Sequence, residues 1–169
     1  MEVIRIWILI RPDAASALED PKVLSALPRY VDVVKNRRTA KFQISRMVPV
    51  DYSDDSPTEE LWMVHERALV KEAELEKSLD HGKVKIGDLK PPQRSLLHLK
   101  HLIGRRILES CVLCERRCMK NRLRGELGYC KVGEETKVSS YFEHMGEEPE
   151  VVPSFTVYGS RHSSVGRPS

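Results

Sequence analysis

The sequence has no apolar run long enough to cross a membrane. The longest candidate, Val3–Ile10, contains eight residues and is interrupted by Arg5, whereas a transmembrane helix needs about 20 apolar residues. The same arginine argues against an ordinary signal peptide. We therefore expect a cytoplasmic protein that does not enter a membrane. In that compartment, clustered cysteines bind metal more often than they form disulfides.

The common catalytic signatures are also missing. The sequence contains no Walker-type phosphate loop, no Gly-x-Gly-x-x-Gly dinucleotide motif and no Gly-x-Ser-x-Gly nucleophile motif. Among the histidines, His144 is the strongest candidate, because the paired carboxylates Glu147 and Glu148 begin three residues after it. A solvated acidic turn is the plainer interpretation of that group. The sequence therefore predicts no catalytic residues.

All four cysteines lie within one 20-residue window, with the spacing C-x2-C-x3-C-x11-C. They are Cys111, Cys114, Cys118 and Cys130. Four thiolates can complete a tetrahedral zinc site, or each can bind one iron of a [4Fe–4S] cluster. Zinc ribbons usually pair two C-x2-C knuckles, whereas three close cysteines and a distant fourth are typical of iron–sulfur proteins. We predict a [4Fe–4S] cluster, with zinc as the alternative and disulfides or free thiols as the third possibility.

Counting the ligands limits what such a centre can do. Four protein thiolates fill every coordination position, so no position remains open for a substrate. The predicted centre is therefore structural or transfers electrons, and it does not activate a reactant itself.

Positive charge is concentrated around the cysteine window. Residues 91–133 contain ten Lys or Arg and three Asp or Glu, whereas the whole chain has a net charge of only +3. These cations either offset the negative charge of four thiolates, which we favour, or form a nucleic-acid footprint over residues 105–124. Base stacking needs interleaved aromatic residues, and Tyr129 is the only aromatic residue between 91 and 133. A nucleic-acid partner is therefore the less favoured interpretation.

The hydrophobic pattern predicts an α+β fold, in which a small N-terminal strand and helix domain leads through long helices into the cysteine module. β-Branched and aromatic residues, or alternating ones, favour strands. Strands are predicted at Val3–Ile10, Lys41–Val50 and Ser154–Tyr158.

Capping residues and prolines mark the predicted helices. Short helices are predicted to begin at Asp13, at Asp20-Pro21 and at Pro28. A long helix follows the capping box Ser56–Glu59 and ends near Leu79. A second covers residues 95–110, with an apolar stripe of Leu96, Leu99, Ile103 and Ile107.

Three regions follow from these patterns. We expect an α/β scaffold over residues 1–90, and a helix with the four-cysteine metal-binding module over residues 91–153. Residues 154–169 are expected to form a partial strand and a disordered tail. Pro91-Pro92 is the clearest break between elements.

From about Pro28 onward, the chain resembles the archaeal radical S-adenosylmethionine proteins related to pyruvate formate-lyase activating enzyme. The resemblance rests on the cysteine window, on Gly125-Glu126-Leu127-Gly128-Tyr129 within it, and on the His144–Pro149 run, His-Met-Gly-Glu-Glu-Pro. Arg29-Tyr30 and Ala40–Phe42 also look like that family's N-terminal extension. In that family, similar segments stand just before the first strand of the radical domain.

The departure from the family decides what the resemblance implies. The family's C-x3-C-x2-C motif, whose open iron binds S-adenosylmethionine, is absent; after Ser154–Tyr158 comes a serine-rich segment, residues 159–169. The resemblance therefore implies an N-terminal accessory region without its catalytic barrel, truncated or frameshifted, inactive alone and binding no S-adenosylmethionine. A separately encoded barrel is the expected partner. The alternative is a zinc-stabilised, basic nucleic-acid-binding module.

Overall fold

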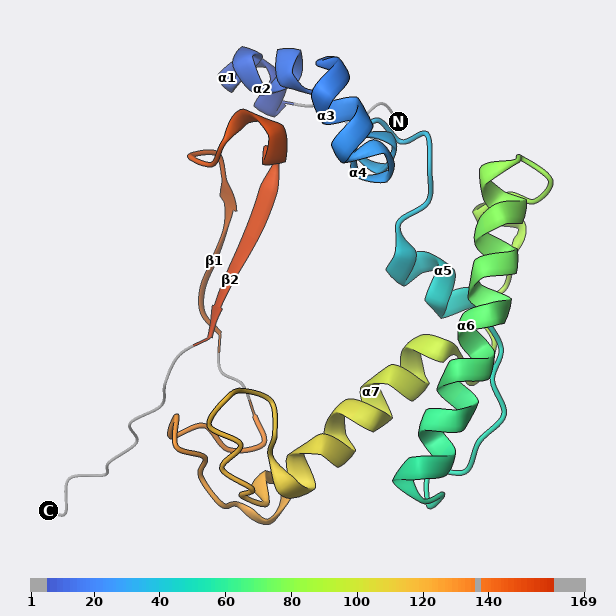
Figure 1. The fold of residues 1–169 in the computed structure, drawn as a ribbon, viewed down its shortest axis with the longest axis vertical. Helices are drawn as coiled ribbons and strands as arrows, with labels where there is room; N and C mark the ends of the chain where they lie inside the picture. Colours follow the sequence, from blue (N-terminus) through green and yellow to red (C-terminus); the bar gives the residue numbers. More distant parts are fainter. Residues whose placement is uncertain (1–5, 136–137, 160–169) are drawn as a thin grey trace, which may run out of the picture. The chain divides into compact units, whose positions relative to one another are not determined.

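The computed structural model describes residues 6–135 and 138–159 (Figure 1). Within them the chain forms two compact units: one takes in the residues up to Lys35 together with those after Glu135, and the other is Asn36–Glu135. The expected boundary at residue 90 lies inside the second unit. Helices and a small two-stranded sheet make up the fold, which agrees with the α+β prediction at that level. The predicted tail at 160–169 lies outside the described residues.

The first unit begins with four short helices. They are α1 (Ile6–Ile10), α2 (Pro12–Ala17), α3 (Pro21–Ala26) and α4 (Pro28–Val34). The helix start at Asp20-Pro21 is confirmed, because the Asp20 carboxylate accepts a hydrogen bond from the Lys22 amide at 2.7 Å. The helix start at Pro28 is confirmed as well. The cap expected at Asp13 is wrong, since α2 begins at Pro12 with Arg11 at its N-cap.

The strand predicted at Val3–Ile10 is wrong for its described residues, which form α1 instead. The Arg11 amide donates to the Trp7 carbonyl at 2.8 Å, so the backbone satisfies its hydrogen bonds locally. A strand would need a neighbour here, and the described sheet contains only β1 (Val138–His144) and β2 (Ser154–Gly159). The missing partner, which composition does not reveal, decides between strand and helix.

The two strands form an antiparallel hairpin in the first unit. The strand predicted at Ser154–Tyr158 is confirmed as β2, and β1 pairs with it in a register that places Tyr141 opposite Val157. The loop between the strands contains the 3₁₀ turn η4 (Pro149–Val151). Arg11 beside α2 donates to the Met145 and Glu147 carbonyls of this loop, so the hairpin is tied to the N-terminal helices.

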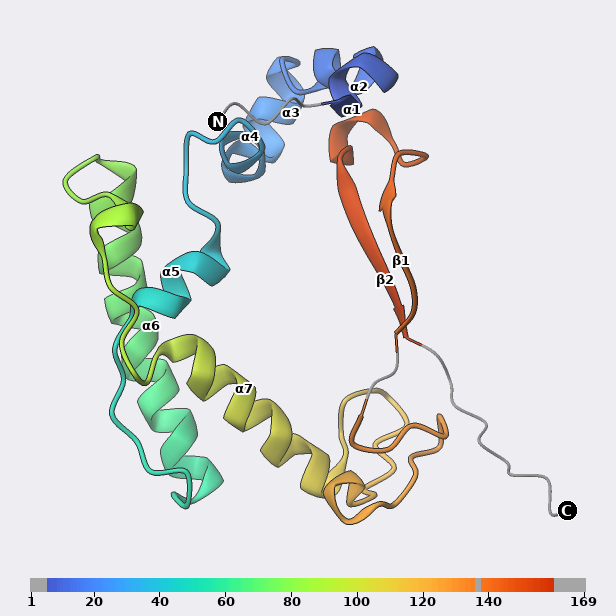
Figure 2. The same ribbon diagram turned by 180° about the vertical axis from the view of Figure 1, so that it is seen from behind.

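Three helices build the second unit: α5 (Lys41–Met47), α6 (Thr58–Asp80) and α7 (Leu96–Ile107). Figures 1 and 2 show α7 crossing α6, with α5 beside them. Their shared core consists of fully or almost fully buried apolar side chains: Val48, Leu61, Ala68, Leu96, Leu99 and Ile103. The apolar stripe predicted for the helix before the cysteines is thus confirmed at three of its four positions, and Ile107 is partly buried against the same core.

The strand predicted at Lys41–Val50 is also wrong, because Lys41–Met47 is helical. The prediction placed Phe42 and Ile44 on one face, but Phe42 is 61% exposed while Ile44 and Val48 are buried. Ile44 and Val48 are four residues apart, which is the spacing of one helical face. Strand-like pairing survives only in the bridge between Pro49 and Ser95.

The predicted ends of the two long helices are confirmed in some cases and wrong in others. The helix predicted over residues 95–110 is confirmed as α7, and the structure adds that Ser95 caps it in a reciprocal capping box with His98. The capping box predicted at Ser56–Glu59 is wrong, because the N-cap of α6 is Pro57, whose side chain makes no capping bond. The predicted end of α6 near Leu79 is confirmed by its last residue, Asp80.

A polar group bridges the three helices of the second unit. The Glu72 carboxylate on α6 is buried and accepts a hydrogen bond from the Ser45 hydroxyl on α5. Lys100 on α7 brings its Nζ to 3.7 Å from Glu72 Oε1 and 3.3 Å from Ser45 Oγ. The buried carboxylate is thus paired, as a buried charge requires.

None of the helices within residues 6–135 and 138–159 combines the length and apolar character that a bilayer crossing demands.

Candidate metal centre

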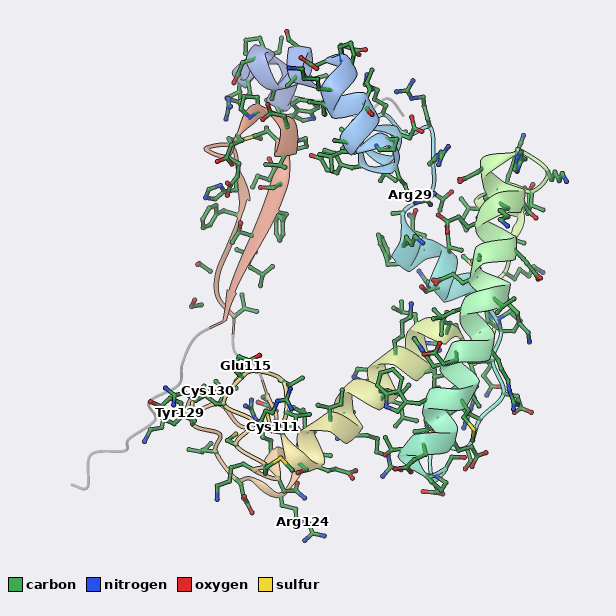
Figure 3. All side chains as sticks on the ribbon, viewed as in Figure 1. Arg29, Cys111, Glu115, Arg124, Tyr129 and Cys130 are labelled. Carbon is green, nitrogen blue, oxygen red and sulfur yellow. The ribbon has the colours of Figure 1, made fainter. Side chains whose placement is uncertain are left out.

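Helix α7 delivers the chain to the cysteine window, which we define as residues 111–130. A 3₁₀ turn, η2 (Leu108–Ser110), continues α7 and ends at Cys111. Figure 3 shows Cys111 where the chain leaves α7, with Tyr129 and Cys130 in the loops that follow. Just beyond the window, Glu134 forms an ion pair with Arg105 of α7 at 2.7 Å (Nη2 to Oε1). Both ends of the loop segment are therefore fixed to the same helix.

Backbone hydrogen bonds fold the first part of the window back on itself. The Cys111 amide donates to the Lys120 carbonyl at 3.2 Å, and the Met119 amide donates to the Cys111 carbonyl at 3.1 Å. The Arg117 amide donates to the Cys114 carbonyl at 2.9 Å and closes a turn between Cys114 and Cys118. Cys111 therefore lies beside the segment that carries Cys118, although seven positions separate them.

Arg122 occupies the interior of the folded window. It lies in the 3₁₀ turn η3 (Arg122–Arg124), whose N-cap Asn121 accepts a hydrogen bond from the Arg124 amide at 3.1 Å. Only 6% of Arg122 is exposed, and its Nη2 donates to the Cys130 Sγ at 3.4 Å. The same guanidinium interacts with the thiols of Cys111 and Cys118. Three of the four predicted ligands thus share one buried cation.

The glycine at position 128 makes room for that guanidinium. A Cβ atom at Gly128 would lie 2.7 Å from Arg122 Nη2, closer than side-chain atoms approach one another. The Gly128 amide also donates to the Val132 carbonyl at 3.1 Å, which starts the turn that presents Cys130. From the sequence, Gly125 and Gly128 are expected only to let the chain turn back so that Cys130 can supply the fourth ligand, and Arg122 is one of several cations. Neither spacing nor composition separates these residues from their neighbours.

Hydrogen bonds favour the thiolate form of Cys118. The backbone amide of Tyr129, then that of Lys120, and more weakly Arg122 and Cys111, lower the pKa of the Cys118 thiol from 9.0 to about 7. Burial alone would lower the pKa of Arg122, but the thiols of Cys111, Cys130 and Cys118 outweigh that effect and raise it. The site therefore places a permanent cation beside the Cys118 thiol, whose charged form is stabilised.

This depressed pKa predicts the reactivity of the metal-free protein. Because the thiolate is the nucleophile, alkylation of Cys118 by iodoacetamide should rise with pH and reach half its maximal rate near pH 7. A free thiol such as N-acetylcysteine, used as control, should reach that point more than one pH unit higher. Peptide mass spectrometry after timed quenching gives the Cys118 rate; a midpoint above pH 8 would contradict the hydrogen bonding described.

Cys114 is placed differently from the other three. Cys111 is buried and Cys118 and Cys130 are half-buried, whereas Cys114 is exposed on its turn. Within the described ranges 6–135 and 138–159, no three His, Cys, Asp or Glu side chains stand close enough together to hold an ion as they are. The donor set nevertheless suits a thiolate-bound group, because one cation and two backbone amides already stabilise sulfur as an anion. A four-coordinate site then requires the Cys114 turn to move inward.

The cations of residues 105–124, the stretch considered as a nucleic-acid footprint, mostly have partners within the protein. Lys120 Nζ lies 3.6 Å from Glu126 Oε2, and Arg106 Nη1 lies 3.0 Å from Glu109 Oε1. The guanidinium of Arg116 stacks over the Tyr129 ring, 4.4 Å from its centroid. Arg105 and Arg122 are engaged as described above. A nucleic-acid footprint would present these charges to solvent, so the contacts favour the interpretation in which they serve the module itself.

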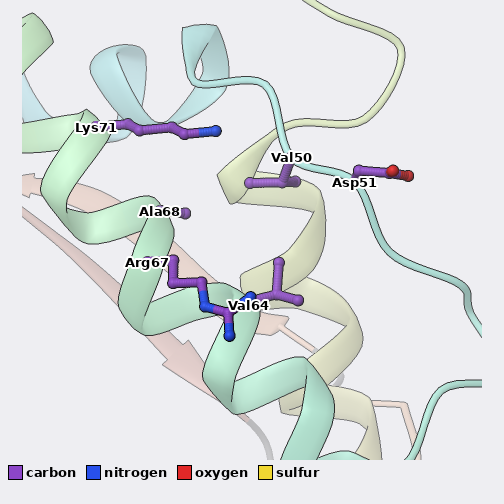
Figure 4. Close-up of a pocket in the computed structure, with 6 residues that line it drawn as sticks. All are labelled: Val50, Asp51, Val64, Arg67, Ala68 and Lys71. Carbon is purple, nitrogen blue, oxygen red and sulfur yellow. The ribbon is translucent and has the colours of Figure 1, made fainter.

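Two other features, an ion pair and a cavity, are weaker candidates for a site. In the first unit, His144 Nδ1 lies 2.7 Å from Glu147 Oε1, which makes an ion pair near the hairpin loop. In the second, a cavity of about 170 Å³ lies between α6 and the segment after α5, with Val50, Val64 and Ala68 around it and Arg67 and Lys71 at its rim (Figure 4). Neither feature gathers three ligand side chains within the described residues. The cysteine window remains the strongest candidate.

Comparison with curated proteins finds an uncharacterized protein of Methanocaldococcus jannaschii, to which this chain is 35% identical over 132 residues. The match covers 78% of this chain but 36% of that protein, so the chain spans little more than a third of its relative's length. No protein-family model and no solved structure matches the chain. What the protein does must therefore be argued from the cysteine window.

Proposed function

We propose that the cysteine window binds a [4Fe–4S] cluster through Cys111, Cys114, Cys118 and Cys130. The observation that carries this proposal is the convergence of three thiols on the buried guanidinium of Arg122. Residues that merely pack would not need a buried cation between them, whereas thiolate ligands do, because a buried anion must be paired. When bound, the cluster would supply either a structural cross-link or a one-electron carrier.

A cluster fits the site better than zinc for two reasons. The first is the ligand spacing, three cysteines close together and one distant. The second is the Nε atom of Arg122, which is buried and has no hydrogen-bond acceptor among the described residues. A cluster brings inorganic sulfides, which accept hydrogen bonds, whereas a zinc ion with four thiolates brings no new acceptor. The orphaned donor therefore favours the cluster.

We further propose that this module is the accessory part of a radical S-adenosylmethionine protein related to pyruvate formate-lyase activating enzyme. The resemblance of the window and of the His144–Pro149 run supports this. So does the longer relative, most of whose length lies outside the match. The module binds no S-adenosylmethionine, since four thiolates leave no open iron. Radical chemistry would need a catalytic barrel, in the same protein or supplied by a separate chain.

Anaerobic purification, followed by reconstitution with iron and sulfide, tests the cluster. We expect a brown protein with about four irons per chain, and a loss of most of that iron in Cys118→Ser. Ser110→Ala, next to Cys111, changes a side chain of similar size without removing a ligand and should retain the iron. One zinc per chain without colour would overturn the cluster in favour of zinc. A protein that binds neither metal would overturn the proposal altogether.

A further inference from the structure

The most unusual side chain of the window is an arginine, not a cysteine. Arg122 is 94% removed from solvent, although arginine is seldom buried without an acidic partner. No ion pair joins it to an Asp or Glu within residues 6–135 and 138–159; the nearby acid, Glu126, pairs with Lys120 instead. Among the described residues, the Cys130 sulfur accepts the side-chain hydrogen bond of Arg122, at 3.4 Å from Nη2. Within this part of the chain, the guanidinium thus has a thiol, and no carboxylate, as its hydrogen-bond partner.

Its neighbours hold it there. Because Gly128 has no side chain, the Arg122 guanidinium can lie close to it, where a Cβ atom would be only 2.7 Å from Nη2. Asn121 caps the turn that carries Arg122, and Gly125 closes that turn in the left-handed region at φ 83°. The side chain cannot swing to solvent without losing its contacts to sulfur. Arg124, two residues later in the same turn, is exposed and makes no such contact.

We propose that Arg122 is a positioning residue that sets the reduction potential of the cluster. This inference rests on the proposed function. The Arg122 guanidinium donates a hydrogen bond to the ligand sulfur of Cys130 at 3.4 Å. Reduction by an external one-electron donor adds one negative charge to the centre and breaks no bond. A fixed cationic N–H donor at the sulfurs therefore stabilises the reduced state more than the oxidised one and raises the potential.

The arginine fork suits this role better than a lysine would. A guanidinium offers five N–H donors in one plane and can reach two sulfurs at once, whereas an ammonium is a compact point charge on a flexible stem. Lysine at position 122 would retain the charge and lose the geometry. Comparing Arg122→Lys with Arg122→Gln therefore separates the contribution of charge from that of directed hydrogen bonds.

The test is a redox titration of the reconstituted protein, followed by electron paramagnetic resonance. In Arg122→Gln we expect the reduced-to-oxidised ratio at fixed potential to fall at least tenfold, a negative shift of about 59 mV for a one-electron couple. Arg122→Lys should shift less. Gly128→Ala, which displaces the guanidinium without removing it, should shift in the same direction as Arg122→Gln. Arg124→Gln, the matched control, should leave the potential unchanged.

The outcomes separate this inference from the proposal beneath it. If Arg122→Gln holds about four irons at the wild-type potential, the inference is wrong and the cluster stands. If the wild-type protein takes up no cluster, both fail. If Arg122→Gln loses its iron, Arg122→Lys and Gly128→Ala decide. A more negative potential in either variant supports the inference, and the wild-type potential in both overturns it.

Discussion

Removing the metal is expected to destabilise residues 111–135, although their backbone hydrogen bonds remain, while the core of α6 and α7 is unaffected. Within the cysteine window, Cys111, Arg122 and Gly128 are the only buried positions, and none of them is a large apolar side chain. Apart from the half-buried Leu123, the large apolar residues of the window are exposed: Val112, Leu113, Met119, Leu127 and Tyr129. The window therefore has no hydrophobic core of its own, and the metal must supply what a core supplies elsewhere.

The size of this effect follows from small metal-folded domains. Structural metal sites in such segments contribute on the order of 10 kcal/mol, and that binding free energy is also folding free energy. The core around Leu61, Leu96 and Leu99, by contrast, is made by helices that contain none of the cysteines. Loss of metal should therefore destabilise residues 111–135 and leave the helical core of the second unit almost unchanged.

Hydrogen exchange followed by mass spectrometry measures this directly, on loaded protein and on protein stripped with a chelator under anaerobic conditions. Peptides from residues 111–135 should exchange faster after stripping, because the metal no longer opposes transient opening of the window. Peptides from α6, Thr58–Asp80, serve as the internal control and should change little. Equal protection of the window in both states would show that the metal adds no stability to it, which would contradict this account.

The fold could be predicted where a local signal agrees with the tertiary environment. Ser95 caps α7 and Asp20 caps α3, because both side chains can reach backbone amides within their own first turn. The stripe of Leu96, Leu99 and Ile103 is buried as its spacing predicts. Where the choice between strand and helix depends on a neighbouring strand that is distant in the sequence, the prediction from local residues is wrong. Ile6–Ile10 is rich in strand-forming residues, yet it is a helix.

The candidate site could be predicted only in part for a similar reason. Four clustered cysteines indicate a ligand set, and the structure gathers Cys111, Cys118 and Cys130 around one cation. That this cation is Arg122 rather than Arg116, Arg117 or Arg124 could not be read from composition, which gives all four the same charge. The choice depends on the turn after Asn121 and on the space beside Gly128, which exist only in the folded chain.

Leu99→Ala is expected to cause a large loss of stability in the second unit. Leu99 is fully buried at the contact between α7 and α6, with Leu61 and Ala68 in the same cluster. Truncation removes three carbon atoms and leaves a cavity that rigid helices fill poorly, so the free energy of unfolding should fall by about 3 kcal/mol. The matched control is Val70→Ala on α6, whose side chain is 61% exposed. It should change stability by less than about 0.5 kcal/mol.

The measurement must report on the second unit alone, because the first unit need not unfold with it. Trp62 lies on α6 and Trp7 lies in the first unit, and they are the only two tryptophans in the chain. In a Trp7→Phe background, urea unfolding followed by tryptophan fluorescence therefore reads the second unit only. A loss below about 1 kcal/mol for Leu99→Ala would contradict the packing of α7 on α6, since a buried leucine in a close-packed core costs more than that to truncate. A loss near 3 kcal/mol would establish α7 as the rigid element that carries Cys111.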